Sequence, residues 1–279
     1  EITYGDWSSD VCSSRSVGII AGSGRLPFVA AAEARAQGRR VVVVGIQGET
    51  DPSLGDVVDV LHWVRLGQLG GVVKRLRREG VTEALLLGNV RITHLFSNIR
   101  PDLLGARVLF KARDLRGDSV LEATVQVLGD EGIRILETPP FLGPLLVRAG
   151  VLTRRAPSEH ERSDIALGRE VARQIAGLRI GQTVVVKRGT IVAVESVEGT
   201  DAAIRRGGEL GRGGVVVVKV ARTDQDLRFD LPTVGPETLN SLRDAAATAL
   251  ALDAGRTLLL DREGFVAGAD ALDLAVVAE

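Results

Sequence analysis

Cysteine and long apolar runs are scarce in this sequence of 279 residues. The one cysteine, Cys12, excludes an internal disulfide and a cysteine zinc cluster, which fits a reducing compartment. No stretch of about 18 uncharged apolar residues occurs, so a membrane-spanning segment is not expected. We therefore predict a cytoplasmic protein, and a peripheral contact with a membrane surface stays open.

Aromatic residues are also few, and the chain has no excess of positive charge. Aromatic side chains make up 3% of the chain, and its formal net charge is −1. Nucleic-acid binding usually relies on a basic surface and on aromatic side chains that stack on bases. The composition therefore predicts no nucleic-acid partner.

The histidines do not form a metal-binding pattern. His62, His94 and His160 are scattered, without the i, i+4 pair of a zinc protease. The segment Gly88-Asn89-Val90 lacks the histidine and the acid that a binuclear metallophosphoesterase loop requires. Both hydrolase types are disfavoured.

The chain length favours two domains. The first fifteen residues, EITYGDWSSDVCSSR, lack an apolar periodicity, and we interpret residues 1–15 as a non-native or disordered leader. A short ordered arm is the alternative. We place a linker near residues 139–164, where prolines and charged residues cluster, between domains at 16–150 and 151–279.

The domain at 16–150 has the pattern of a Rossmann-like fold. SVGII, RRVVVVGI and VTEALLLGNV read as buried strands, and they alternate with helical segments at 28–38 and 66–80. A further helix is expected at 118–132, before a strand IRILET. This alternation predicts an α/β fold with a parallel sheet.

The domain at 151–279 reads as mixed α/β. A helix at 164–178 precedes a hairpin at 182–197, and the runs GVVVVKVA and LRFDL predict two more strands. A closing helix is expected at 238–255, before a strand RTLLLD. We predict that this second domain is catalytic.

The turn Gly22-Ser23-Gly24 follows a strand and precedes a helix, so its amides can approach a phosphate. A dinucleotide fingerprint would place a third glycine where Pro27 stands. Glu49 is a candidate ribose-binding acid in an NAD interpretation, but an acid in such a GlyGluThrAsp turn is more often a solvated loop residue. A nucleotide or phosphate site is favoured over NAD itself.

A second polar corner surrounds Gly199 and Thr200. Glu195, Glu198 and Asp201 flank this turn, where a helix is expected to open. Either Thr200 or Asp201 caps that helix, or the corner holds phosphoryl oxygens and a magnesium ion. Lys219 stands in the apolar run GVVVVKVA, so its charge requires a partner.

Asp230 lies in LRFDLPTVGPET, just before Pro232. Because Pro232 ends any strand, we place Asp230 at a strand's carboxyl end, with a helix beginning near Pro236. The acid either satisfies turn amides or serves a reaction. The residues alone favour the turn.

Taken together and in order, several motifs resemble the LpxI family over residues 16–279. They are IIAGSGRLP, the GlyAsnVal segment, RGDSVLEA, LRIGQTVVVKRG, AVESVEGTDAAIRR and VKVARTDQDLRFDLPTVGPETL. The resemblance implies hydrolysis of UDP-2,3-diacylglucosamine to UMP and 2,3-diacylglucosamine 1-phosphate, a step of lipid A biosynthesis in Gram-negative bacteria. It also implies dependence on a divalent cation such as Mg²⁺, and it makes Asp230 the essential carboxylate.

With that resemblance, we assign catalytic roles to Asp230, Asp201 and Lys219. Metal ligation is assigned to Asp230, Asp201 and Glu198. The expected substrate-binding residues are Gly22, Ser23, Gly24, Leu26, Pro27, Gly88, Asn89, Gly199, Thr200 and Thr233.

Two alternatives remain beside this hydrolase. An NAD-linked oxidoreductase would need the third glycine and an acid or base at the nicotinamide, and a nucleotide-lipid binding protein would lack the acids that are present here. Peripheral contact with the inner membrane and a homodimer both stay open.

Overall fold

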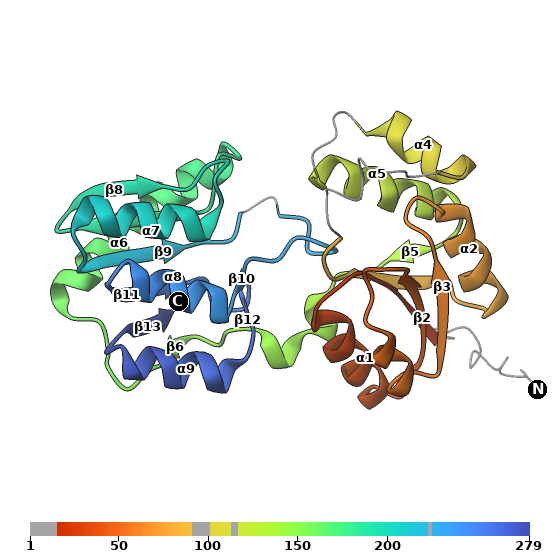
Figure 1. The fold of residues 1–279 in the computed structure, drawn as a ribbon, viewed down its shortest axis with the longest axis horizontal. Helices are drawn as coiled ribbons and strands as arrows, with labels where there is room; N and C mark the ends of the chain where they lie inside the picture. Colours follow the sequence, from red (N-terminus) through yellow and green to blue (C-terminus); the bar gives the residue numbers. More distant parts are fainter. Residues whose placement is uncertain (1–15, 91–100, 113–116, 223–224) are drawn as a thin grey trace, which may run out of the picture. The chain divides into compact units, whose positions relative to one another are not determined.

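The computed structural model describes residues 16–90, 101–112, 117–222 and 225–279, in two compact units (Figure 1). The first unit runs to Leu142 and includes Leu227–Phe229, and the second comprises the rest of the chain. The predicted leader, with Cys12, lies outside the described residues, as does His94.

Within the described residues, the first unit contains a five-stranded sheet of order β3-β2-β1-β4-β5, with every pairing parallel. Its strands are β1 (Ser16–Ala21), β2 (Arg40–Ile46), β3 (Val60–Val64), β4 (Glu83–Leu87) and β5 (Arg134–Ile135). Its helices are α1 (Leu26–Ala36), α2 (Leu69–Arg78), α4 (Leu103–Lys111) and α5 (Gly117–Asp130), with 3-10 turns at Pro52–Asp56 and Pro139–Phe141. The parallel Rossmann-like sheet predicted from the sequence is confirmed.

Burial explains why these strands read as unbroken apolar runs. The four valines at 41–44 of β2 are fully buried, because β2 lies between β1 and β3 and is covered on both faces. The sequence reasoning missed β3, whose segment VLHWV is only partly buried at the sheet edge.

The second unit contains a mixed six-stranded sheet of order β6-β13-β11-β9-β7-β8 within the described residues. Its strands are β6 (Gly150–Val151), β7 (Thr183–Lys187), β8 (Thr190–Val194), β9 (Val215–Lys219), β11 (Ala247–Leu252) and β13 (Ala275–Ala278), and a separate pair joins β10 (Thr233–Val234) to β12 (Leu258–Leu259). The helices are α6 (Glu159–Gly177), α7 (Thr200–Gly211), α8 (Pro236–Asp244) and α9 (Arg262–Ala271), with a 3-10 turn at Gly143–Leu145. Strands β9, β11 and β13 are mutually parallel, whereas β7 runs antiparallel to both β8 and β9. The predicted mixed α/β class is confirmed.

Alternate residues of β9 enter two different cores, one on each face of this sheet. Val215 and Val217 pack in a cluster with residues of α7, α8 and α9, whereas Val216 and Val218 pack in a cluster with residues of α6. Figure 1 shows these helices around the strands. Because side chains alternate along a strand, Lys219 continues the row of Val215 and Val217, toward α7.

Two sequence-based element predictions are wrong. The predicted helix at 238–255 ends at Asp244, and residues 247–252 form β11. Alanine favours helix, but this segment is buried between β9 and β13, and burial there outweighs propensity.

The predicted strand LRFDL does not form either. Leu227 accepts hydrogen bonds from the amide and the hydroxyl of Thr138, both at 2.9 Å, and Phe229 packs against the apolar core of the first unit. These contacts take the place of a strand ladder. Asp230 therefore does not lie at a strand's carboxyl end.

Helix α6 begins at Glu159, inside the predicted linker, because a capping box starts it there. The Ser158 hydroxyl accepts the amide of Glu161 at 3.3 Å, and the Glu161 carboxylate accepts the amide of Ser158 at 2.7 Å. Arg155 donates two hydrogen bonds to the same carboxylate, at 2.8 and 2.9 Å. It also donates to the carbonyls of Thr248 and Asp273, and so ties α6 to the sheet.

This arrangement makes the stability of the second unit depend on pH. Burial opposes ionisation of Glu161, but Arg155 and Ser158 outweigh it and lower the pKa of the carboxyl from 4.5 to about 2. A lowered folded-state pKa contributes stability that is present above pH 4.5 and is lost as the pH falls toward 2.

We predict that Glu161→Gln lowers the free energy of unfolding at pH 7 by about 1–2 kcal/mol, because the charge-assisted bonds to Arg155 are lost. Thermal melts of wild type and variant should converge as the pH falls from 4.5 to 2. Glu159→Gln, an exposed first-turn neighbour, is the control and should lose about 0.3–1 kcal/mol. A Glu161→Gln deficit that persists unchanged at the lowest pH would contradict this role of the charge.

Candidate active site

The polar residues of the second unit gather where β9 ends. Lys219 is 6% exposed and follows the apolar row of Val215 and Val217. Its Nζ donates to Thr200 Oγ1 at 3.1 Å and to the carbonyl of Thr233 at 3.2 Å. The partner that the sequence required for this buried cation is therefore present.

Thr200 connects this lysine to a buried acid. The Thr200 hydroxyl donates to Glu195 Oε1 at 2.8 Å, and Glu195 Oε2 accepts the amide of Gln182 at 3.1 Å. Glu195 follows β8 and donates its own amide to Thr183 at 2.9 Å, and Thr183 pairs with Lys219 across the ladder between β7 and β9. The sheet register therefore brings the acid and the lysine to one edge of the sheet, the one at which β9 ends.

The charges at this edge act on Lys219 in opposite senses. Burial lowers the pKa of its ammonium group, because the charged form loses its hydration. The carboxylates of Glu195, Asp201 and Asp230 oppose that shift. Two of the predicted catalytic residues, Asp201 and Asp230, are thus within electrostatic reach of the third, Lys219.

The helix cap expected at Thr200 or Asp201 does not form. Gly199 is the N-cap of α7, with φ of 83°, and no side chain caps the helix. Asp201 instead accepts a hydrogen bond from the buried Ser241 of α8 at 2.9 Å, and Thr200 is engaged by Lys219 and Glu195. These side chains are therefore oriented by tertiary contacts and leave the first-turn amides without a side-chain cap.

Asp230 is held by a cation. Its carboxylate forms an ion pair with Arg222, and its amide donates to the carbonyl of Asp226 at 2.9 Å. Arg222 follows β9 by three residues, so the pair lies in the segment that continues from Lys219. Asp230 is consequently a paired side chain and not a simple turn cap.

Glu198 does not join the other acids. It forms an ion pair with Arg206 and accepts the amide of Ser196 at 3.2 Å. Its own backbone amide and then Arg206 lower the pKa of the carboxyl. Among the described residues, no three His, Cys, Asp or Glu side chains are grouped to hold a metal ion. The metal set of Asp230, Asp201 and Glu198 stays a prediction.

In the first unit, the glycine turn and the segment after β4 are brought together. Ser23 and Asn89 exchange backbone hydrogen bonds of 2.8 and 3.0 Å, and the Ser23 hydroxyl donates to the Asn89 carbonyl at 2.8 Å. A Cβ at Gly22 would lie 2.5 Å from the Asn89 carbonyl oxygen, and one at Gly88 would lie 2.6 Å from that of Ser23. Both glycines are required because the two segments approach closely.

These contacts change what the turn can offer a phosphate. The amides of Gly22 and Ser23 donate to the carbonyls of Leu87 and Asn89, both at 2.8 Å. Neither amide is available to a ligand. The residues that remain are Gly24, with φ of 96° and open space around it, and the start of α1, where Leu26 and Pro27 lie. Their role in substrate binding stays a prediction.

The sequence reasoning did not assign roles to Arg222 or Ser241, and it named Glu195 only among the acids of the polar corner around Gly199 and Thr200. Arg222 carried a signal, because a cation eight residues before a suspected functional acid is a candidate partner. Ser241 carried none, since it reaches Asp201 only through the packing of α8 beside α7.

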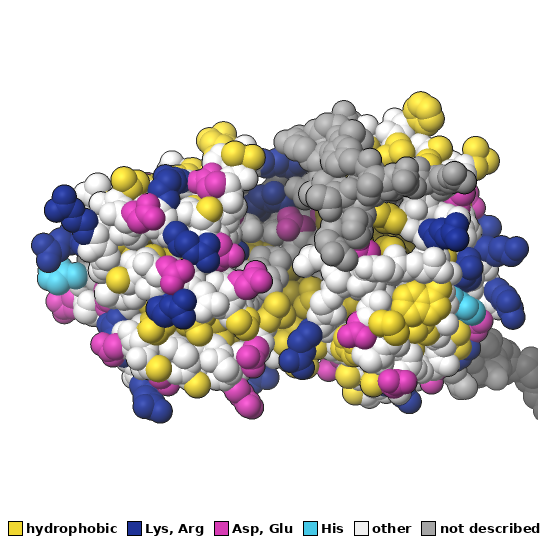
Figure 2. Space-filling model, in the orientation of Figure 1, with side chains coloured by type: hydrophobic (Ala, Val, Ile, Leu, Met, Phe, Trp, Pro, Cys, Tyr) yellow, Lys and Arg dark blue, Asp and Glu magenta, His cyan; other side chains and the backbone are white. Residues whose placement is uncertain are grey.

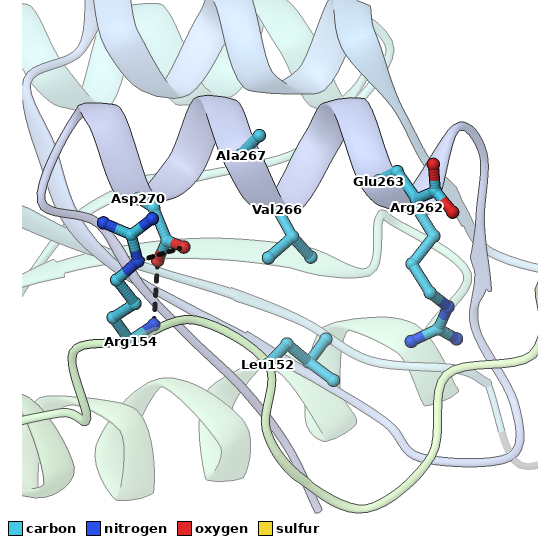
Figure 3. Close-up of a pocket in the computed structure, with 7 residues that line it drawn as sticks. All are labelled: Leu152, Arg154, Arg262, Glu263, Val266, Ala267 and Asp270. Carbon is cyan, nitrogen blue, oxygen red and sulfur yellow. Dashed lines mark hydrogen bonds and ion pairs between the residues drawn. The ribbon is translucent and has the colours of Figure 1, made fainter.

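A surface hollow of about 460 Å³ lies elsewhere in the second unit, along α9 (Figure 3). Leu152, Val266 and Ala267 form its apolar part, between Arg154, which pairs with Asp270, and Arg262 with its neighbour Glu263. None of the predicted site residues lines it.

Comparison with known proteins gives two adjoining family matches. The LpxI N-terminal domain matches residues 16–145, and the LpxI C-terminal domain matches residues 148–277. A relative from Caulobacter vibrioides, named UDP-2,3-diacylglucosamine pyrophosphatase LpxI, is 35% identical over 274 residues, covering 94% of this chain and 97% of the relative.

Two solved structures show distant similarity. Biotin carboxylase from Campylobacter jejuni aligns with a TM-score of 0.29 at 10% identity, covering 70% of this chain and 41% of that one. N5-carboxyaminoimidazole ribonucleotide synthetase from Thermotoga maritima aligns with a TM-score of 0.23 at 14% identity, covering 66% of this chain and 42% of that one. This chain thus spans well under two thirds of either structure, and neither bears on function.

We predict that Gly22→Ala destabilises the first unit by about 1–3 kcal/mol, because its methyl group would overlap the Asn89 carbonyl. The matched control is Gly129→Ala in α5, where a Cβ meets nothing within 4 Å and helix propensity improves. Urea unfolding monitored by circular dichroism should separate the two variants. Equal stability of the two variants would contradict this prediction. It would show that the turn after β1 and the segment after β4 can separate with little loss of free energy.

Proposed function

The chain belongs to the LpxI family, and on that premise we propose that it hydrolyses the diphosphate of UDP-2,3-diacylglucosamine to UMP and 2,3-diacylglucosamine 1-phosphate, a step of lipid A biosynthesis. The structural observation that supports this most directly is the buried Lys219, set among carboxylates at the end of β9. A buried cation at a strand's carboxyl end suits a phosphoryl substrate.

Each component of this edge has a use in diphosphate hydrolysis. Negative charge on the reacting phosphoryl group must be neutralised, and Lys219 and Arg222 supply positive charge. The first turn of α7 supplies further positive potential, because Gly199 caps it without a side-chain bond. A carboxylate must orient the attacking water, and we assign that role to Asp230.

Dependence on Mg²⁺ is part of the proposal. Carboxylate oxygens are the ligands Mg²⁺ prefers, and Asp201 and Asp230 are the two acids of the predicted set that lie in electrostatic reach of Lys219. Glu198 fits this set less well, since it is not among the carboxylates that act on Lys219. When bound, the metal would offset charge on the diphosphate oxygens.

The oxidoreductase alternative receives no support. It needed a third glycine, where Pro27 stands, and the amides of Gly22 and Ser23 already donate to Leu87 and Asn89 instead of facing a dinucleotide. Nothing in the comparisons favours it.

The remaining partners also belong to the proposal. We expect a cytoplasmic protein that contacts the inner membrane peripherally, because the substrate carries two acyl chains, and a homodimer stays open. In the described part of the chain, no helix is both long and apolar enough to cross a bilayer. Figure 2 shows acidic and basic side chains interspersed on the visible face.

The direct test is to incubate the purified chain with UDP-2,3-diacylglucosamine and Mg²⁺ and to measure UMP release. Chelation of the metal should abolish the release, and added Mg²⁺ should restore it. Release of UDP, or of any uridine product other than UMP, would refute the assigned reaction.

We predict that Asp230→Asn lowers turnover by about 10²-fold to 10³-fold, because an amide cannot replace the charge that orients water or holds the metal. The melting temperature should change little, since asparagine keeps the size and an acceptor. Asp244→Asn is the control, because Asp244 is an exposed acid that also pairs with arginine. Near-normal turnover of the Asp230 variant would move the search to Asp201.

A further inference from the structure

Glu195 is a buried acid whose hydrogen-bond partners among the described residues are both neutral. Its side chain is 8% exposed, and its two oxygens accept from the Thr200 hydroxyl and the Gln182 amide. A buried carboxylate is costly unless a compensating charge lies near. A nearby cation is Lys219, and Thr200 lies between the two side chains. The negative charge of Glu195 stabilises the charged form of Lys219.

The direction of this hydrogen-bond chain is determined by chemistry. The ammonium group of Lys219 can only donate, and the carboxylate of Glu195 can only accept. The single hydroxyl proton of Thr200 must therefore point to Glu195, at 2.8 Å, and its lone pair must face Lys219, at 3.1 Å. Thr200 is thereby oriented by the acid and in turn orients the ammonium group.

The ammonium group retains one unassigned donor. Of its three N–H bonds, one reaches Thr200 and another the Thr233 carbonyl, and no acceptor among the described residues takes the third. With two directions set, the third is set as well, since the nitrogen is tetrahedral. This third N–H has a fixed direction and no acceptor among the described residues, so it can donate to an oxygen of a ligand.

We propose that Glu195, acting through Thr200, is a positioning residue that fixes the orientation of the Lys219 ammonium group and aims its third N–H at a phosphoryl oxygen of the substrate. This inference rests on the proposed diphosphate hydrolysis. It reassigns Thr200 from direct substrate contact to orientation of the lysine.

The electrostatics of the edge support this role. Burial lowers the pKa of Lys219, and Glu195 leads the opposing charges, ahead of Asp201 and Asp230. Loss of the Glu195 charge therefore lowers the pKa of Lys219 further. If the charged lysine is needed for turnover, activity will then be lost at a lower pH than in the wild type.

The experiment compares Thr200→Val, Thr200→Ser and Glu195→Gln in the full chain, with UDP-2,3-diacylglucosamine and Mg²⁺. Valine keeps the shape of threonine and removes the hydroxyl, whereas serine keeps the hydroxyl. Glu209→Gln, an exposed acid later in α7, is the control for loss of a carboxylate. Melting temperatures and the pH dependence of kcat/KM are measured for all variants.

We expect Thr200→Val to lower kcat/KM by about 10-fold to 100-fold and Thr200→Ser to restore most of that loss. Glu195→Gln should lower kcat/KM and shift its alkaline limb to lower pH, whereas Glu209→Gln should match the wild type. Equal activity of the valine and serine variants, or a Glu195→Gln profile with an unmoved alkaline limb, would overturn the inference.

If Glu195→Gln does not fold, the comparison of Thr200→Ser with Thr200→Val tests the inference without it. A wild-type chain that releases no UMP refutes the proposed function and, with it, the inference. A wild-type chain that is active, with variants that match it, refutes only the positioning role.

Discussion

Burial of one positive charge organises the second unit. Strand β9 carries four valines into the centre of the sheet and ends in Lys219, whose side chain follows the same face as Val215 and Val217. An ammonium group in such a place is tolerable only if acceptors and negative charge surround it. The acceptors come from Thr200 and Thr233, and the negative charge comes from acids that other strands and helices bring to the same edge.

That requirement links the local structures around the edge. The hairpin of β7 and β8 brings Glu195 beside the start of β7, and the uncapped start of α7 directs Thr200 to the lysine. Helix α8 supplies Ser241 to Asp201. Each polar group thus has a partner on a different element, which is the condition for a preorganised site. A phosphoryl substrate would meet charges already held in place.

In the first unit, by contrast, the polar groups at the strand ends are backbone amides and carbonyls that hydrogen-bond to one another. Gly22 and Gly88 permit the turn after β1 and the segment after β4 to come within hydrogen-bonding distance, and the amides of Gly22 and Ser23 are used there. A glycine-rich turn after a strand is therefore not in itself a phosphate site. Here the glycines are explained by contact between the two segments, and any ligand must use the amides that follow.

The sequence by itself determined the α/β class, the parallel sheet of the first unit, most of the strands and the family, because apolar runs and turn residues act locally and ordered motifs survive in the chain. It also identified Lys219 as a cation in need of a partner and Asp230 as an acid of interest. Only the tertiary structure decided that residues 247–252 are a strand, since burial between two strands outweighed the helix propensity of alanine. It likewise decided that Asp230 pairs with Arg222 and that Glu195, not Glu198, faces the lysine. Sheet register and helix packing bring these residues together from distant positions in the chain, and a single sequence does not show them.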